Sequence, residues 1–362
     1  MRYCFIAPDF YPRIGGGENY VRYLAEHLAE DGNTVYVITP NALKRGTILL
    51  NKVAVIYSNF YIFFGNKFVK PWLLFYQLRR INPQVIYVSG PGIGDIFALL
   101  CSKILRKSIV TTYHADLNNE KFTSRLFVKS YCRLVAKHFD KIIVQNSLYR
   151  DLLHSRKIPY SKLYLVPPGV VMGASAKTSV ALKKQNLLLF VGVLDRDHHY
   201  KNLDLLIDAM HFLPNFHLNI VGDGESRKLF ENQAHDLQNI NFLGQLTKPE
   251  LDTAYDTASI FVLPSNSPAE GFGVVLVEAL SHGCMIITGE AAGGSDLTTN
   301  AGELGMLYNG TVSDLINKIK KLENRQVSEE QLESILDLIG EYSWEHVARR
   351  INSICEQIAN TT

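Results

Sequence analysis

The chain has 362 residues, of which 47% are hydrophobic and 20% are charged, and it contains 13 prolines. This length predicts two α/β domains, each able to bury a core of its own. The composition excludes a peptide, a disulfide-stapled module and an intrinsically disordered protein. The five cysteines are widely spaced and form no CxxC pair, so we expect them to be reduced and structural.

The net charge of +2 conceals a difference between the two halves of the chain. Residues 1–176 carry 23 Lys and Arg against 10 Asp and Glu, whereas residues 177–362 carry 14 against 25. A basic half predicts an anionic partner, for which nucleic acid, a phospholipid surface and a polyprenyl phosphate are the candidates. No apolar run reaches the roughly 18 residues of a membrane span, and Pro8 and Pro12 interrupt the first segment. We expect a cytoplasmic protein, with a peripheral position on the inner face of the membrane left open.

The first half alternates short apolar runs with segments of helical periodicity. The runs expected as strands are 2–8, 34–40, 84–90, 108–114 and 141–146, and the segments expected as helices are 18–30, 94–106 and 122–138. Apolar strands separated by helix-length segments predict a parallel sheet covered by helices, a Rossmann-like domain. The segment 166–180 is rich in Pro, Gly and small residues, which indicates a linker.

The same rhythm begins again after the linker, so the second half is expected to be another α/β domain. Its expected strands are 186–193, 217–223, 240–244, 259–264, 285–290 and 305–310, with helices at 202–212, 225–238, 248–258 and 274–282. In the final segment Val347, Ile351, Ile354 and Ile358 are spaced as on an amphipathic helix. Ligands of parallel sheets bind at the carboxyl ends of the strands, and two such domains are expected to enclose a cleft.

Two features of the first half are candidates for ligand contact. Gly15, Gly16 and Gly17 follow the first strand, where glycines let backbone amides approach a phosphate. The full GxGxxG pattern of dinucleotide binding is absent, and a plain turn is the alternative. His114 ends an apolar run and is followed by Asp116, so it either contacts a ligand or is a satisfied buried histidine.

The loop 192–201 of the second half brings Arg196 and Lys201 to the end of a strand, ahead of a helix. Two cations in that position suit a diphosphate. The same loop contains Asp195 and Asp197 around Arg196, formally a DxD metal pattern. We disfavour metal binding there, because neighbouring side chains seldom point at one ion and an arginine lies between them.

Glu270 and Glu278 are the strongest candidates for a functional site. They lie eight residues apart, with Gly271, Phe272 and Gly273 after the first and a helical pattern from Val274 to His282. Backbone amides at the start of that helix can hold the anionic end of a ligand, while carboxylates accept hydrogen bonds from hydroxyls. Because carboxylates repel phosphate, these two are expected to face sugar hydroxyls.

The segment 61–141 carries 13 Lys and Arg against 4 Asp and Glu, and aromatic residues gather at its start. These aromatic residues are Tyr61, Phe63, Phe64, Phe68, Trp72, Phe75 and Tyr76. A basic, aromatic surface is typical of an interfacial membrane contact. Core aromatics beside a solvated basic face are the alternative.

Taken together, these segments resemble the family 4 retaining glycosyltransferases of the GT-B fold. The resemblance rests on PRIGGGENYV, IVTTYHADL, VGVLDRDHHYKNLDLLIDA, VGDGE, EGFGVVLVE and YSWEHVA, in this order along nearly the whole chain. It implies two Rossmann-like domains facing across a cleft, an acceptor-binding domain at 1–175 and a nucleotide-sugar-binding domain at 176–342. It also implies that the last helix, about 343–362, crosses back onto the N-terminal domain.

The resemblance implies a role for each matching residue. Gly16 and Gly17 would lie near the donor phosphate and His114 would contact the transferred sugar. Lys201 would bind the diphosphate, Glu270 the sugar hydroxyls and Glu278 the ribose. Gly222 and the amides of Phe272, Gly273 and Val274 would complete the donor site. The family commonly has an arginine where this chain has Val193, so Arg196 would reach the diphosphate in its place.

The implied reaction is transfer of a sugar from a UDP- or GDP-sugar to a glycan or lipid-linked acceptor, with retention of configuration. The resemblance implies no metal and no other cofactor. The basic N-terminal half would meet an anionic membrane surface, and no nucleic-acid partner is expected. Two alternatives stay open, a nucleotide-sugar isomerase or phosphorylase on the same fold and a catalytically silent partner subunit. The donor base, the sugar, the linkage and the oligomeric state are not predicted.

Overall fold

The computed structural model describes residues 1–8, 10, 16–40, 46–63, 66–114, 130–171 and 183–359. Gly15, Asp116, residues 122–129 of the expected helix 122–138, part of the expected linker 166–180 and the expected boundary at 175–176 lie outside these residues. The chain divides into two compact units. Unit 1 comprises Met1–Gly169 and Ser343–Thr362, and unit 2 comprises Val170–Tyr342.

Unit 1 is built on an eight-stranded sheet with the order β10-β9-β8-β7-β1-β2-β4-β3. The strands are β1 (Arg2–Ile6), β2 (Thr34–Pro40), β3 (Gly46–Leu50), β4 (Val53–Ser58), β7 (Val85–Gly90), β8 (Ser108–Tyr113), β9 (Lys141–Val144) and β10 (Leu163–Leu165). All neighbours pair in parallel except β3 and β4. The chain reverses its direction of travel across the sheet between β1 and β7, so the loops after these two strands diverge.

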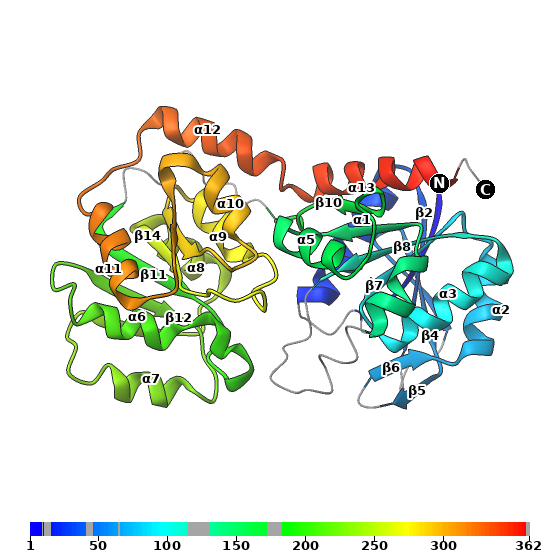
Figure 1. Cartoon of the computed structure of the whole chain (residues 1–362), viewed down its shortest axis with the longest axis horizontal. Coiled ribbons are helices and arrows are strands. Elements are labelled where there is room, and N and C mark those ends of the chain that lie inside the picture. Colours follow the sequence, from blue (N-terminus) through cyan, green and yellow to red (C-terminus); the bar gives the residue numbers. More distant parts are fainter. Residues whose placement is uncertain are drawn as a thin grey trace. The chain divides into compact units, whose positions relative to one another are not determined.

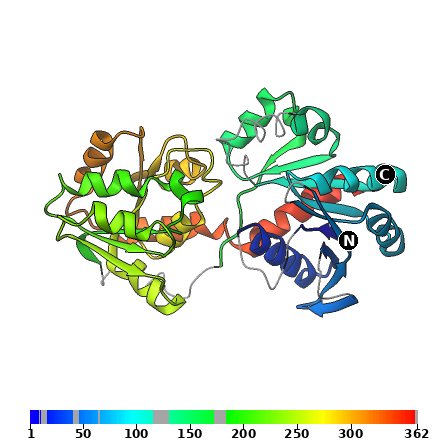
Figure 2. The ribbon, with the colours of Figure 1, turned by 90° about the horizontal axis from the view of Figure 1, so that it is seen from below.

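The helices of unit 1 cover both faces of this sheet (Figure 1). They are α1 (Gly16–Glu30), α2 (Pro71–Ile81), α3 (Ile93–Leu105), α5 (Ser147–Ser155) and α13 (Trp344–Ala359). The last helix, drawn in red in Figure 2, lies beside α1 although it ends the sequence. Its apolar face, Val347, Ala348 and Ile351 included, belongs to the same core cluster as Leu24 of α1, which explains the amphipathic spacing of the final segment.

The aromatic stretch between β4 and β7 contains a small antiparallel hairpin, which the strand and helix patterns of the sequence did not predict. The hairpin consists of β5 (Phe60–Phe63) and β6 (Asn66–Val69) and precedes α2. Tyr61, Ile62, Trp72 and Tyr76 are exposed, whereas Phe68 and Phe75 are partly buried. The aromatic residues are thus divided between core and surface.

Unit 2 is a six-stranded parallel sheet with the order β13-β12-β11-β14-β15-β16. The strands are β11 (Lys184–Val191), β12 (His217–Val221), β13 (Ile240–Gly244), β14 (Ala258–Leu263), β15 (Met285–Gly289) and β16 (Gly305–Tyr308). The helices are α6 (Leu203–Met210), α7 (Arg227–Gln233), α8 (Lys248–Thr257), α9 (Val274–Ser281), α10 (Ser295–Asn300), α11 (Val312–Lys321) and α12 (Glu329–Gly340). A 3₁₀ helix, η4 (Arg196–Lys201), precedes α6. The α/β prediction with two Rossmann-like halves is confirmed.

Candidate active site

The site of unit 2 lies where the direction of the sheet reverses. Strands β11 and β14 are neighbours at the centre of the sheet, and the chain moves outward from each in opposite directions. The loops 192–195 and 264–273 that follow these strands therefore start from the same edge. In open parallel sheets this reversal point is where ligands bind.

Lys201 and Glu270 meet at this edge. The Lys201 Nζ lies 3.4 Å from Glu270 Oε2, and their side chains are only 13% and 10% exposed. Glu270 Oε2 accepts no hydrogen bond from the residues that the structure describes. A buried charge pair is costly unless further hydrogen bonds satisfy it. Polar or charged groups of a ligand could supply those hydrogen bonds to Lys201 and Glu270.

The first turn of α9 supplies backbone donors next to Glu270. Gly273 caps the helix with a left-handed φ of 74°, a conformation that favours glycine. Among the residues that the structure describes, the amides of Gly273, Val274 and Val275 have no hydrogen-bond acceptor. The side chain of Phe272, in the loop before the helix, is buried and packs on Tyr342. Unpaired amides at a helix N-terminus favour an anion.

Glycines let the backbones of neighbouring loops come into contact around the site. Gly222 has a φ of 136°, and a Cβ built there would lie 1.8 Å from the carbonyl oxygen of Gly192. Similarly, a Cβ on Gly293 would lie 2.0 Å from the carbonyl oxygen of Gly271. Gly222 therefore has a steric role in addition to the donor-binding role expected for it.

The loop after β11 holds Arg196 apart from the buried pair. The side chain of Arg196 is 80% exposed, and its Nε lies 3.8 Å from Glu225 Oε1. Val193 is also exposed. Asp195, the first residue of the DxD pattern, caps η4 by accepting hydrogen bonds from the backbone amide and the Nδ1 of His198. That pairing gives Asp195 a structural role in the loop.

Glu278 lies on α9, but its hydrogen-bond partner comes from α8. The hydroxyl of Tyr255 donates to Glu278 Oε2 at 3.1 Å. Burial raises the pKa of Glu278, and the opposing effects of Lys248 and of the Tyr255 hydrogen bond are smaller. Tyr255 also stacks on His282, which pairs with Asp256 at 2.7 Å. The two predicted glutamates thus contact different groups, Lys201 for Glu270 and Tyr255 for Glu278.

In unit 1, His114 lies at the carboxyl end of β8 and is held by two neighbouring strands. Gln145 Nε2 lies 3.0 Å from His114 Nδ1, and Ser89 Oγ lies 2.7 Å from His114 Nε2. Tyr20 of α1 packs edge-on against the imidazole with ring centroids 4.7 Å apart. Burial lowers the pKa of His114 from 6.5 to about 4, so the imidazole is neutral at pH 7.

Gly16 and Gly17 form the start of α1 in the structure. Sequence reasoning missed three residues of this region, Tyr20, Ser89 and Gln145, which all contact His114. A signal for two of them was available, because Ser89 and Gln145 end or follow strands just as His114 does. Tyr255, which binds Glu278, carries no comparable signal because it lies inside a helix.

Two protein-family models match this chain. Residues 14–172 match the model described as Glycosyltransferase Family 4, and residues 174–335 match Glycosyl transferases group 1. The chain belongs to the family 4 glycosyltransferases. It is therefore a glycosyltransferase with the GT-B fold, an enzyme of the EC 2.4 class.

Relatives that match over nearly the whole of this glycosyltransferase include two curated enzymes. A sulfoquinovosyl transferase of Arabidopsis thaliana is 24% identical over 96% of this chain and 72% of its own length. A phosphatidyl-myo-inositol mannosyltransferase of Mycobacterium tuberculosis is 24% identical over 100% of this chain and 98% of its own. Among solved structures, HepE of Anabaena in complex with UDP has a TM-score of 0.72 at 18% identity, covering 99% of this chain and 100% of that one. In the described part of this chain, no helix is long and apolar enough to cross a membrane.

Proposed function

We propose that this glycosyltransferase moves a sugar from a UDP- or GDP-sugar to a lipid-linked acceptor, with retention of configuration and without a metal ion. The observation that carries the donor assignment is the Lys201–Glu270 pair beside the unpaired amides of α9. A cation and helix amides favour a diphosphate, while a buried carboxylate accepts hydrogen bonds from sugar hydroxyls. The UDP complex of HepE supports a nucleotide donor.

The proposed reaction breaks the bond between the sugar's anomeric carbon and the diphosphate and forms a bond from that carbon to an acceptor hydroxyl. The leaving diphosphate takes up the hydroxyl proton on the face it departs from, which retains the configuration. Lys201 and the α9 amides stabilise the negative charge that develops on the diphosphate, and Glu270 orients the sugar. The neutral imidazole of His114 contributes a contact to the transferred sugar.

A lipid-linked acceptor is supported by one surface of unit 1 and by the relatives. Tyr61, Trp72 and Tyr76 are exposed, and Tyr61 packs against Trp72; we call these three residues the aromatic patch. Lys70 Nζ lies 5.0 Å from the centre of the Tyr61 ring and 5.5 Å from that of Trp72. Aromatic rings combined with cations suit the headgroup region of an anionic membrane. The relative from Mycobacterium tuberculosis is named for a phosphatidyl-myo-inositol acceptor.

The donor assignment is tested by a thermal-shift titration with UDP, GDP, ADP and their sugar conjugates. A ligand at 100 times its dissociation constant should raise the free energy of unfolding by roughly 2.7 kcal/mol, a shift of a few degrees. The shift should be selective for one base and should diminish in Glu278→Ala, whereas Glu333→Ala on the exposed face of α12 should respond as wild type does. A chain that no nucleotide stabilises would contradict the proposal and favour a silent subunit or a lipid-carried donor.

Metal independence is tested by the transfer rate in the presence of EDTA. The rate should be unchanged, because Lys201 and the helix amides supply the positive charge that a metal supplies in other enzymes. Loss of the rate and its restoration by Mn²⁺ would instead indicate that Asp195 and Asp197 bind a metal.

A further inference from the structure

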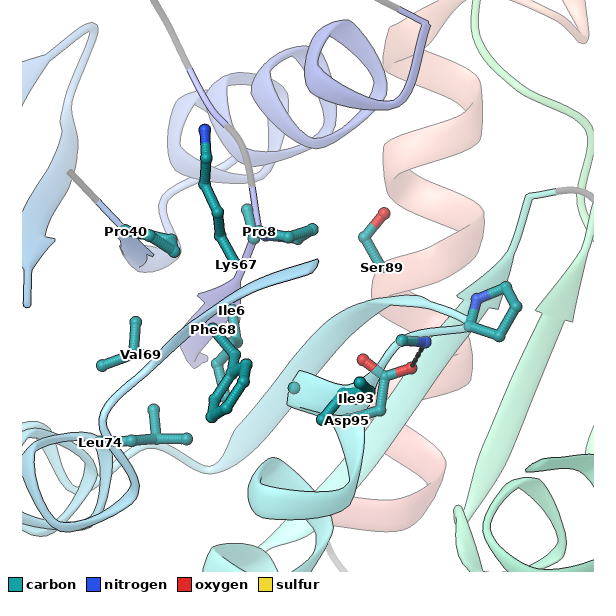
Figure 3. Close-up of a pocket in the computed structure, with 14 residues that line it drawn as sticks. Ile6, Pro8, Pro40, Lys67, Phe68, Val69, Leu74, Ser89, Ile93 and Asp95 are labelled. Atoms are coloured by element: carbon teal, nitrogen blue, oxygen red, sulfur yellow. Dashed lines mark hydrogen bonds between the residues drawn. The ribbon is translucent and has the colours of Figure 1, made fainter. Parts of the chain in front are cut away.

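A pocket in unit 1 is lined by Ser89, which contacts His114, and includes neither Lys201 nor Glu270 in its lining. It opens at the carboxyl ends of β1 and β7, where the direction of the sheet in unit 1 reverses. The hairpin strand β6 and the first turn of α3 complete its walls, as Figure 3 shows. Its lining is mostly apolar, with Phe68, Val69 and Leu74 on the hairpin side and Ser89 and Asp95 among the polar residues.

The polar end of the pocket is defined by how His114 is held. As Gln145 is oriented, its Nε2 donates to His114 Nδ1, so the neutral imidazole carries its proton on Nε2 and donates it to Ser89 Oγ. The hydroxyl proton of Ser89 then has no acceptor among the described residues. Ser89 therefore offers a hydrogen-bond donor to the pocket.

Asp95 supplies an acceptor to the same pocket. Its Oδ2 accepts hydrogen bonds from the Gly92 amide at 2.8 Å and from the Tyr131 hydroxyl at 2.6 Å. Its Oδ1 has no such partner among the residues that the structure describes, so it retains capacity to accept a hydrogen bond from a ligand. A donor and an acceptor in one apolar pocket match a hydroxylated group.

The hairpin connects the pocket to the aromatic patch. Phe68 lies on the pocket side of the hairpin and stacks on Phe97 with ring centroids 5.2 Å apart. Tyr61, paired with Phe68 in the hairpin, is exposed and packs against Trp72. An apolar chain leaving the pocket along the hairpin thus passes from the Phe68 side to the patch.

We propose that this pocket binds the acceptor, an amphiphile whose hydroxylated head group lies against Ser89 and Asp95 and whose apolar chain follows the β5–β6 hairpin. The inference rests on the proposed transfer to a lipid-linked acceptor and assigns its binding site. The hairpin would then determine which acceptors are used, because it supplies the apolar wall.

The test fills the pocket and measures amphiphile binding by isothermal titration calorimetry. Gly94 lies on the first turn of α3 and lines the pocket, and a Cβ there would lie 3.5 Å from the Cβ of Phe68. Gly94→Leu should therefore weaken binding of octyl β-D-glucoside and of dihexanoyl phosphatidylinositol, both below their micelle concentrations, by roughly tenfold or more. Glucose and myo-inositol, which lack the chain, should bind neither protein measurably.

Gly340→Leu is the matched control, because Gly340 is also a helical glycine and has nothing within 4 Å of its Cβ position. It should bind both amphiphiles as wild type does. Gly94→Ala, a milder change, keeps the test valid if the leucine variant does not fold. Wild-type protein that binds neither amphiphile saturably, or a folded Gly94→Leu protein with unchanged affinity, would overturn the assignment.

The nucleotide thermal shift separates this assignment from the proposed function. Gly94→Leu should retain the full shift, since Lys201, Glu270 and the α9 amides belong to unit 2 and do not line the pocket. A wild-type chain that binds the amphiphiles but no nucleotide would contradict the donor proposal and leave the pocket assignment standing. If Gly94→Leu lost both the amphiphile binding and the nucleotide thermal shift, the substitution would have a general structural effect, and the specific role of the pocket would be overturned.

Discussion

Lys201 and Glu270 form an ion pair whose side chains are largely buried. Lys201→Met should lower the transfer rate by roughly 100-fold or more, because the proposed mechanism uses the positive charge of Lys201 to stabilise the leaving diphosphate. It should also lower the free energy of unfolding by about 3 kcal/mol, because it leaves the Glu270 carboxylate buried without a partner. Urea denaturation and initial-rate assays measure the two effects.

The double variant Lys201→Met, Glu270→Gln separates stability from chemistry. It should recover most of the lost stability, since no unpaired charge remains, but none of the lost activity. Recovery of activity along with stability would show that the pair serves folding alone.

Two buried groups of unit 1 have pKa values displaced in opposite directions by burial. His114 has its pKa lowered from 6.5 to about 4, so the unfolded chain binds a proton there that the folded chain does not. This makes the free energy of unfolding fall as the pH drops from 6.5 to 4. Asp95 has its pKa raised from 3.8 to about 6, so the folded chain holds the extra proton. The contribution of Asp95 to the free energy of unfolding therefore falls as the pH rises from 3.8 to 6.

Substitution of either group should remove its contribution to the pH dependence of the free energy of unfolding, so the difference between variant and wild type should change with pH. Relative to wild type, His114→Asn should gain stability on acidification from pH 6.5 to 4, by about 3 kcal/mol at most. Asp95→Asn should gain stability relative to wild type as the pH rises from 4 to 6. Urea denaturation at several pH values measures both differences, and a difference that stays constant across these ranges would contradict the assigned cause.

At the scale of elements, the edge of the unit 2 sheet depends on loops that touch through their backbones. Gly222→Ala should lower the free energy of unfolding of unit 2 by about 3 kcal/mol or more, since the added Cβ would overlap the carbonyl oxygen of Gly192. Gly302→Ala is the control, because Gly302 also has a positive φ, 58°, but has nothing within 4 Å. It should cost only about 1 kcal/mol. Equal losses in the two variants would show that backbone strain alone, without the contact, accounts for the effect.

At the scale of the whole molecule, the basic charge of residues 1–176 and the aromatic patch should act together on a membrane. The protein should sediment with vesicles of phosphatidylcholine and phosphatidylglycerol but not with phosphatidylcholine alone, and rising salt should weaken the binding. Trp72→Ala should weaken it by about tenfold. Phe212→Ala, which removes an equally exposed aromatic ring from unit 2, should leave it unchanged. Equal partition to both kinds of vesicle would contradict the charge argument.

The alternation of apolar runs and helical segments was enough to predict two α/β domains, because burial of a parallel strand on both faces leaves a local mark on the sequence. The positions of Glu270, Glu278, Lys201 and His114 relative to those strands indicated the candidate site, and the motifs around them indicated the family by their resemblance to it. The hairpin β5–β6 escaped prediction because its strands are short and its aromatic residues are divided between core and surface.

Only the tertiary structure decided which of these side chains meet. The pairing of Lys201 with Glu270 depends on β11 and β14 being neighbours, and the hold on His114 depends on β7 and β9 flanking β8. Likewise, Glu278 binds Tyr255 because the fold brings this side chain of α8 to α9. Strand order and helix packing arise from contacts between segments far apart in the chain, so local periodicity carries no record of them. The sequence by itself therefore determined the two α/β domains with many of their elements, the candidate residues and the family, while the partners of those residues were decided by how the sheets assemble.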